Sequence, residues 1–207
     1  MSGFLRRYTE LPFVLDYLRT KELTLLSPRT WDDKNDSYYV EAYAKAKNLT
    51  AVYVLCLTEA NETYHHWKVF SSGSNGVCIV FKKESLIGWA KQIDYLRVAP
   101  VKYRTLKQCR EALPELEDLP FLKRQAFEDE LEFRLFATPS SVRSGPLRLK
   151  LPVSTIDRLM LNPWLPKSVA DHVKATLKGV EGCRSLKVYR STLVDNEAWK
   201  KFAAIEA

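Results

Sequence analysis

The chain has 207 residues, of which 46% are hydrophobic and 28% charged, an ordinary composition for a globular protein with room for one substantial core or two small domains. No apolar run approaches the roughly 20 residues that a membrane-spanning helix needs, and the first residues lack the pattern of a signal peptide. The net charge is +7, and residues 140–207, with 12 Lys and Arg against 6 Asp and Glu, carry +6 of it. We expect a single domain over residues 1–207 without membrane contact, whose basic C-terminal portion, 140–207, packs on the core.

The four cysteines are scattered along the chain and form no Cys-x-x-Cys pair. Cys56 and Cys78 lie inside apolar runs, which is typical of reduced core residues. A cytoplasmic protein without disulfides is therefore the expectation. Metal binding is disfavoured, because His65 and His66 are adjacent and the chain has no cluster of Cys and His at ligand spacing.

Strand and helix patterns follow one another without strict alternation. Apolar periodicity predicts strands at residues 6–8, 23–26, 51–57, 76–81, 98–103, 130–136 and 186–190, with a short apolar segment at 156–161. Helical spacing predicts helices over 11–18, around Trp67, over most of 106–128 with interruptions at Pro114 and Pro120, and over 166–177 and 197–205. Residues 31–36 and 138–146 have the composition of loops. The mixture predicts an α+β fold with a single mixed, mainly antiparallel sheet and flanking helices.

The most informative stretch is Glu130-Leu-Glu-Phe-Arg134. Side chains alternate between the two faces of a strand, so we expect Glu130, Glu132 and Arg134 on one face and the intervening apolar residues, among them Leu131, in the core. Neighbouring like charges raise the pKa of one carboxyl group, whereas an adjacent Arg lowers carboxyl pKa values. The pattern suits a catalytic site, and it suits a structural ion pair or a solvated charged strand face as well.

Several enzyme classes are disfavoured because their motifs are missing. The chain contains no P-loop, no G-x-G-x-x-G and no G-x-S-x-G, the signatures of P-loop kinases, Rossmann enzymes and α/β-hydrolases. The pair Arg6-Arg7 suits either a surface strand or bidentate phosphate binding. Trp67 is interpreted first as a lid over the edge of the core, and the acidic segment 31–36 mainly as capping and turn residues.

Several segments, taken in order, resemble the bacterial family of unknown function DUF2971. They are Arg7-Tyr8, an L-x-L-x-S-x-P-like strand at 23–28, an aromatic and acidic loop at 31–36, a C-F-S-E-like step at 56–59, a Trp-containing helix, G-x-C-I-x-F at 76–81 and E-x-E-[YW]-R at 130–134. The likeness spans roughly residues 7–195. The chain departs from the family where Lys34-Asn-Asp-Ser37 replaces Asn-Asp-Pro, and where Leu57 and Thr58 replace Phe and Ser.

A more distant resemblance is to ADP-ribosyltransferases, which have a first-strand Arg or His and an E-x-E on a late strand. It implies an ADP-ribosyltransferase-like fold that uses NAD. By this resemblance, Glu132 is the catalytic carboxylate that stabilises the oxocarbenium-like transition state, and Glu130 is its partner that orients or activates the acceptor. The Ser-Thr-Ser motif of those enzymes has only a faint counterpart here, Cys56-Leu-Thr58.

The same resemblance implies the cofactor-binding residues. Arg7 is expected to hold the NAD phosphates, with Tyr8 beside it. Trp67 or Tyr64 is expected to stack on the nicotinamide.

The leading hypothesis is thus an ADP-ribosyltransferase-like protein that uses NAD to modify a nucleic acid or a protein, as a toxin or phage-defence effector would. The alternative is a non-enzymatic module that binds nucleic acid or a partner protein. A basic surface attracts phosphates, although a merely solvated basic face carries equal weight. The predicted nucleic-acid contacts are Arg143, Arg148, Lys150, Arg158, Lys167 and Lys174. A third hypothesis is a metal-dependent nuclease built on Asp32, Asp33, Asp36 and Glu59.

Overall fold

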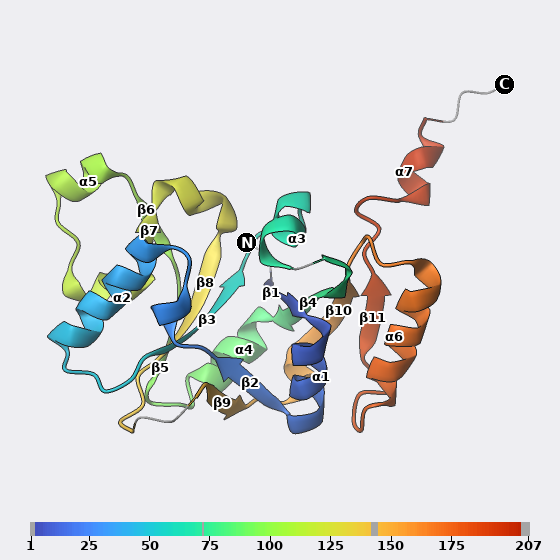
Figure 1. Cartoon of the computed structure of the whole chain (residues 1–207), viewed down its shortest axis with the longest axis horizontal. Coiled ribbons are helices and arrows are strands. Elements are labelled where there is room, and N and C mark those ends of the chain that lie inside the picture. Colours follow the sequence, from blue (N-terminus) through green and yellow to red (C-terminus); the bar gives the residue numbers. More distant parts are fainter. Residues whose placement is uncertain (1–2, 72, 142–144, 204–207) are drawn as a thin grey trace.

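The computed structural model describes residues 3–71, 73–141 and 145–203 (Figure 1). The strands are β1 (Phe4–Glu10), β2 (Glu22–Leu25), β3 (Tyr53–Thr58), β4 (Gly76–Lys82), β5 (Leu96–Pro100), β6 (Lys102–Arg104), β7 (Leu122–Arg124), β8 (Glu132–Ala137), β9 (Leu147–Lys150), β10 (Ile156–Leu161) and β11 (Lys187–Arg190). The α-helices are α1 (Leu11–Thr20), α2 (Lys34–Ala46), α3 (Tyr64–Phe70), α4 (Lys83–Ala90), α5 (Leu106–Glu111), α6 (Lys167–Gly179) and α7 (Glu197–Lys201). Short 3-10 helices cover Pro28–Thr30, Gly73–Asn75, Leu116–Phe121, Gln125–Glu130 and Val153–Thr155.

Seven of the strands form one sheet in the order β11-β10-β4-β1-β3-β8-β5. Neighbours in this sheet are antiparallel, except β10 and β11, which are parallel. The other strands form two small sheets, β2 with β9 and β6 with β7. The predicted α+β class, with a mixed and mainly antiparallel sheet and flanking helices, is confirmed. No helix in the described part of the chain is both long and apolar enough to cross a bilayer.

The main core lies on one face of the sheet. There α1, α4, α6 and the small sheet β2–β9 cover the strands, with buried contacts from Leu18, Leu86, Leu177 and Leu149. Apolar residues recur at helical spacing in α1, where Val14, for example, is fully buried together with Leu18. This large continuous cluster holds both halves of the sheet together.

The second face carries two separate apolar clusters. The first joins Trp67 of α3 to Tyr8 of β1 and Met160 of β10. The second joins Val40 of α2 to Phe136 of β8, among others. Because α3 and α2 cover different halves of the sheet, the strip between them is left open.

The strip lies where the sheet itself divides. β1 pairs with β4 along its whole length but with β3 only at Arg6 and Thr58. Beyond that pair, the edge of β3 that faces β1 bonds to groups outside the sheet. Val54 exchanges two backbone hydrogen bonds with Leu26, of 2.7 and 3.0 Å. Alternate residues of a strand present their backbone groups to the same neighbour, so the carbonyl of Cys56 also faces this gap. It accepts a hydrogen bond of 3.0 Å from Nη1 of Arg7.

Most predicted elements are present, and a few predictions were wrong. The segment 106–128 contains only the six-residue α5, two 3-10 helices and β7 in place of a long helix, and the predicted strand 98–103 is divided between β5 and β6. Helices α2 and α4 were not predicted. Asp33 caps α2 by accepting from the backbone N–H groups of Asn35 and Asp36, so the acidic loop is in part the start of a helix. The predicted final helix ends at Lys201, and residues 204–205 of that prediction lie outside the described residues.

Candidate functional site

A cavity of about 580 Å³, which we call the central cleft, occupies the open strip between α2 and α3. Its floor is formed by residues 6–10 of β1 and 56–58 of β3. Its walls come from residues 31–33 before α2 and Asp36 within it, from Val69 and Phe70 of α3, and from Lys123, Phe127, Glu130 and Glu132. The volume lies within the range usual for small-molecule and cofactor sites. Arg7, Glu130 and Glu132, which are far apart in the sequence, therefore meet in one cavity.

Beneath the cleft lies a fully buried guanidinium, that of Arg134. Its Nε donates to Oε1 of Glu132 over 2.8 Å, and its Nη1 and Nη2 donate to the two carboxylate oxygens of Asp36 over 3.0 and 2.8 Å. A further bond of 2.8 Å goes to the carbonyl of Pro120, and the group lies 5.0 Å from the ring centroid of Trp31. Of the alternatives that the sequence pattern left open for Arg134, the geometry is that of a structural ion pair, in which buried charges are paired and hydrogen-bonded.

The expectation that Glu130 shares a strand face with Glu132 was wrong. β8 begins at Glu132, whereas Glu130 ends a 3-10 helix, and Leu131 between them has a left-handed backbone with φ of 41°. That turn places the Leu131 side chain in solvent, 51% exposed, where the alternation predicted a core residue. The strand pattern fails here because the local turn overrides the period of two.

Lys123 brings the two glutamates together in spite of the turn. Its Nζ donates to Oε2 of Glu130 over 2.6 Å and to Oε2 of Glu132 over 3.4 Å. Thr58 adds a hydrogen bond of 2.5 Å from its hydroxyl to the carbonyl of Glu130, and Tyr103 accepts one of 2.8 Å from the backbone N–H of Glu132. Lys123 was not predicted as a site residue, because no motif in the sequence around it marks it.

The environments of the two glutamates move their pKa values apart. Burial by itself would raise the pKa of Glu132, but the charge and hydrogen bond of Arg134, with the charge of Lys123, lower that pKa to about 2. The pKa of Glu130 is raised, because burial outweighs the attraction of Lys123 and the charge of Glu132 adds to the shift. One carboxylate is thus fixed as an anion and the other is more readily protonated.

Arg7 crosses the gap between β1 and β3. Burial lowers the pKa of its guanidinium, while nearby Cys56 and Glu132 act in the opposite direction. Cys56 also lines the cleft, and burial together with the charge of Glu132 raises the pKa of its thiol well above the usual range. The thiol is therefore not an activated nucleophile.

Unpaired polar atoms concentrate around the cleft. Four buried side-chain atoms in the described residues have no hydrogen-bond partner: Arg6 Nε, Tyr8 Oη, Asp33 Oδ2 and His66 Nε2. The first three belong to residues that line the cleft, and His66 stacks on Tyr8 with ring centroids 5.5 Å apart. Buried polar groups are nearly always paired, so this concentration is what a ligand site leaves open.

The two residues predicted to stack on the nicotinamide, Trp67 and Tyr64, do not line the central cleft. Trp67 is only 1% exposed, meets Tyr8 edge to face and donates to Glu62 over 2.7 Å. Its ring has no free face for stacking, so it supports Tyr8 from within the core, and the stacking interpretation is corrected. Tyr64 is exposed but packs on Trp164, outside the cleft.

The predicted nucleic-acid contacts do not gather on one element. Arg148 pairs with Asp16 and Glu22, and Lys150 also pairs with Glu22. Arg158 forms an ion pair with its neighbour Asp157 on β10. Lys167, which is exposed, and Lys174, which is half-buried, both lie on α6. Arg143 lies outside the described residues.

Three of the four carboxylates of the nuclease hypothesis have partners within the protein. Asp36 binds Arg134, Asp33 caps α2 and Glu59 pairs with Lys83. Within the described ranges, no three His, Cys, Asp or Glu residues are placed to hold a metal ion together.

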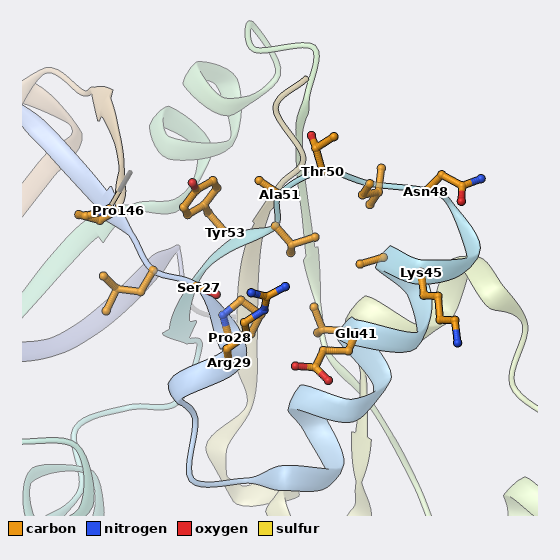
Figure 2. Close-up of a pocket in the computed structure, with 16 residues that line it drawn as sticks. Ser27, Pro28, Arg29, Glu41, Lys45, Asn48, Thr50, Ala51, Tyr53 and Pro146 are labelled. Carbon is orange, nitrogen blue, oxygen red and sulfur yellow. The ribbon is translucent and has the colours of Figure 1, made fainter. Parts of the chain in front are cut away.

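A larger cavity, of about 1070 Å³, lies between α2 and the segment before β3. Figure 2 shows Pro28 and Arg29 on one side of it and Glu41 and Lys45 of α2 on another. Its lining includes none of the predicted catalytic residues. Size alone therefore does not mark the functional site.

No family model matches the chain, and no curated protein matches it. Among solved structures it is similar to DarT of Thermus sp. 2.9 in complex with ADP-ribosylated single-stranded DNA, with a TM-score of 0.47 and 11% sequence identity. The likeness covers 91% of this chain and 94% of that one. At this similarity we draw no argument about function from it.

Proposed function

We propose that the protein is an ADP-ribosyltransferase-like enzyme that cleaves NAD in the central cleft and transfers ADP-ribose to a nucleic acid or a protein. The observation that carries the proposal is the convergence of Arg7, Glu130 and Glu132 on one cleft that also contains unpaired buried polar atoms. Membership of DUF2971, and with it a role as a toxin or phage-defence effector, remains part of the proposal.

The residues fit the chemical groups of NAD. Arg7 supplies a guanidinium group for the pyrophosphate, which arginine binds with matched geometry. The neighbouring Arg6 also lines the cleft, but its Nη1 and Nη2 donate to the carbonyl of Ala60 and to the side chain of Asn61. The unpaired hydroxyl of Tyr8 and carboxylate oxygen of Asp33 supply one donor and one acceptor for ribose hydroxyls or the carboxamide. Phe13 and Phe70 are exposed aromatic rings on the cleft wall, available to a heterocycle.

The two glutamates fit different parts of the transfer. The C1′–N bond of the nicotinamide ribose breaks, the electron pair leaves with neutral nicotinamide, and positive charge develops on the ribose. Glu132, an anion at neutral pH because of its pKa of about 2, stabilises that charge. An acceptor oxygen or nitrogen then bonds to C1′, and its proton passes to Glu130, whose raised pKa suits a general base.

The test is release of nicotinamide from labelled NAD, with and without nucleic acid or protein acceptors. Glu132→Gln is expected to lower the rate at least about a hundredfold, as loss of one preorganised electrostatic contact does. Glu130→Gln should lower transfer to the acceptor. Glu128→Gln is the matched control and should retain the wild-type rate. Glu128 lies on the same 3-10 helix but is exposed, and its side chain bonds only to Gln125 among the described residues. Equal rates for all three variants, or no cleavage by the folded wild type, would refute the proposal.

The non-enzymatic alternative gives a separate outcome in the same experiment. A binding module would retain nucleic acid or protein without consuming NAD. Its binding would be unaffected by Glu132→Gln, provided that circular dichroism shows the variant to be folded.

A further inference from the structure

A second cavity, of about 350 Å³, adjoins the central cleft, and we call it the side cavity. It lies between α2 on one side and β6, α5 and β7 on the other, elements that are neighbours at one end of the molecule (Figure 1). Asp33, Asp36 and Lys123 line both cavities, so the two share a wall. Lys123 is also the residue that holds Glu130 and Glu132, so a molecule in the side cavity is next to the carboxylates.

Two arginines stand side by side in this cavity. Arg104 and Arg124 are direct partners in the parallel pairing of β6 with β7, and both line the cavity. Arg104 donates to the carbonyl of Ala112, and the side chain of Arg124 has no hydrogen bond or ion pair among the described residues. Like charges opposite each other on neighbouring strands are destabilising unless something neutralises them. The arrangement therefore favours an anionic ligand with more than one charge, such as successive phosphates.

Aromatic side chains stand opposite the arginines. Tyr38 on α2 is 67% exposed and Tyr39 is half-buried, and both line the cavity. Neither has a hydrogen bond, ring contact or ion pair within the described part of the chain. Alternation of cations with exposed aromatic rings is the pattern that binds single-stranded nucleic acid, because phosphates meet the charges while unstacked bases lie on the rings.

The shared wall offers a hydrogen bond that a base can make. Oδ1 of Asp33 is used in capping α2, whereas its Oδ2 is buried and without a partner. A carboxylate oxygen accepts from the amino or ring N–H groups of bases, which a phosphate alone does not supply. Charge, stacking surface and a buried acceptor thus point to one ligand class.

We propose that the side cavity binds a base and the neighbouring phosphates of a single-stranded nucleic acid, and so presents the acceptor to the central cleft. That the bound nucleic acid is the acceptor rests on the proposed function. The binding site itself is inferred from the residues of the side cavity alone. It moves the nucleic-acid contacts from the C-terminal portion, where Arg148 and Arg158 are paired with carboxylates, to the region around α2. A cavity of this size admits an unstacked base and not a duplex.

The test is fluorescence anisotropy with short labelled single-stranded DNA and RNA, duplex DNA and polyglutamate, without NAD and over a range of salt concentrations. Tyr38→Ala should weaken binding of single strands roughly tenfold, the loss of one stacked base. Arg124→Gln should lower the slope of log Kd against log salt by about 0.7, the loss of one phosphate contact on a single strand. The controls are Tyr189→Ala and Arg184→Gln, also exposed but on or before β11, and they should bind as the wild type does.

Each other result overturns the inference. Site variants that bind like the controls would refute it, as would weakening by Lys167→Gln with Lys174→Gln instead, or preference for duplex or polyglutamate. No binding of any oligonucleotide by the wild type would refute it as well. Since binding is measured without NAD, normal binding with no NAD cleavage would refute only the proposed function.

Discussion

Replacing Arg134 with Met should cost about 3–5 kcal/mol of the free energy of unfolding, although the substitution keeps a side chain of similar length. The guanidinium is fully buried and donates three hydrogen bonds to two carboxylates, those of Asp36 and Glu132. Glu132 would keep Lys123 at 3.4 Å, but Asp36 would lose every side-chain partner that it has in the described structure. Removing one partner of a buried ion pair leaves an uncompensated charge, which is the origin of this magnitude.

The assay is urea denaturation at neutral pH, with Arg148→Met as the matched control. Arg148 also contacts two carboxylates, those of Asp16 and Glu22, but its side chain is partly exposed and solvent screens these pairs, so its loss should cost far less than the loss of Arg134. The difference in free energy of unfolding between the wild type and Arg134→Met should become smaller as pH falls towards 5. Without Arg134, the buried carboxylates would have raised pKa values in the folded variant, so they would bind protons there at a higher pH than in the unfolded chain. Equal losses for the two variants, or a gap independent of pH, would show that burial of the network is not what makes it stabilising.

Three further predictions concern single sites. In the folded protein the pKa of Glu132 is lowered from 4.5 to about 2, so its ionised form contributes about 3 kcal/mol to the free energy of unfolding. This contribution is complete above pH 4.5 and is lost as pH falls towards 2. The free energy of unfolding should therefore fall less steeply with acid for Glu132→Gln than for the wild type, and equal slopes would contradict the shift. Leu131→Gly should raise the urea midpoint, with a gain of about 1 kcal/mol, because the side chain is exposed and its φ of 41° strains any L-residue; a lowered midpoint would contradict this. Gly76→Ala should destabilise by about 1–3 kcal/mol, since an added Cβ would lie 2.6 Å from Cβ of Ser71; thermal melting checks it, and an unchanged Tm would show that the Ser71 segment yields without cost.

The sequence was sufficient for elements whose burial gives a regular apolar pattern. The continuous apolar run of β4, the helical stripe of α1 and the core-facing Phe133 and Leu135 of β8 are examples. In these segments local preference and tertiary burial agree, so pattern and structure coincide.

Apolar periodicity could not predict segments whose structure depends on helix caps and turns. α2 starts at a cap supplied by Asp33, and its sequence is too polar to show a clear stripe. The left-handed turn at Leu131 is set by contacts of its neighbours, including the bond from Thr58 to the carbonyl of Glu130. Pairwise contacts between distant segments leave no periodic signal in a single sequence.

The candidate site divides in the same way. The pair Glu130 and Glu132 stood out by residue type and spacing, whereas the role of Arg7 was implied by the resemblance to ADP-ribosyltransferases. The three residues do lie in one cleft. Lys123, which joins the two glutamates, and Asp36, which anchors Arg134, were not assigned these roles, because each acts through a partner more than five residues away. The nucleic-acid prediction relied on net charge alone, and charge does not distinguish paired from unpaired cations.

The single pairing of Arg6 with Thr58 has a mechanical consequence. It leaves two blocks of strands, β11-β10-β4-β1 and β3-β8-β5, that are joined by few backbone hydrogen bonds and by the apolar layer on the opposite face. A molecule in the central cleft would contact both blocks, so its binding free energy would stabilise their association. Amide hydrogen exchange in β1 and β3 should then slow in concert when the cleft is filled, making the two blocks one cooperative unit.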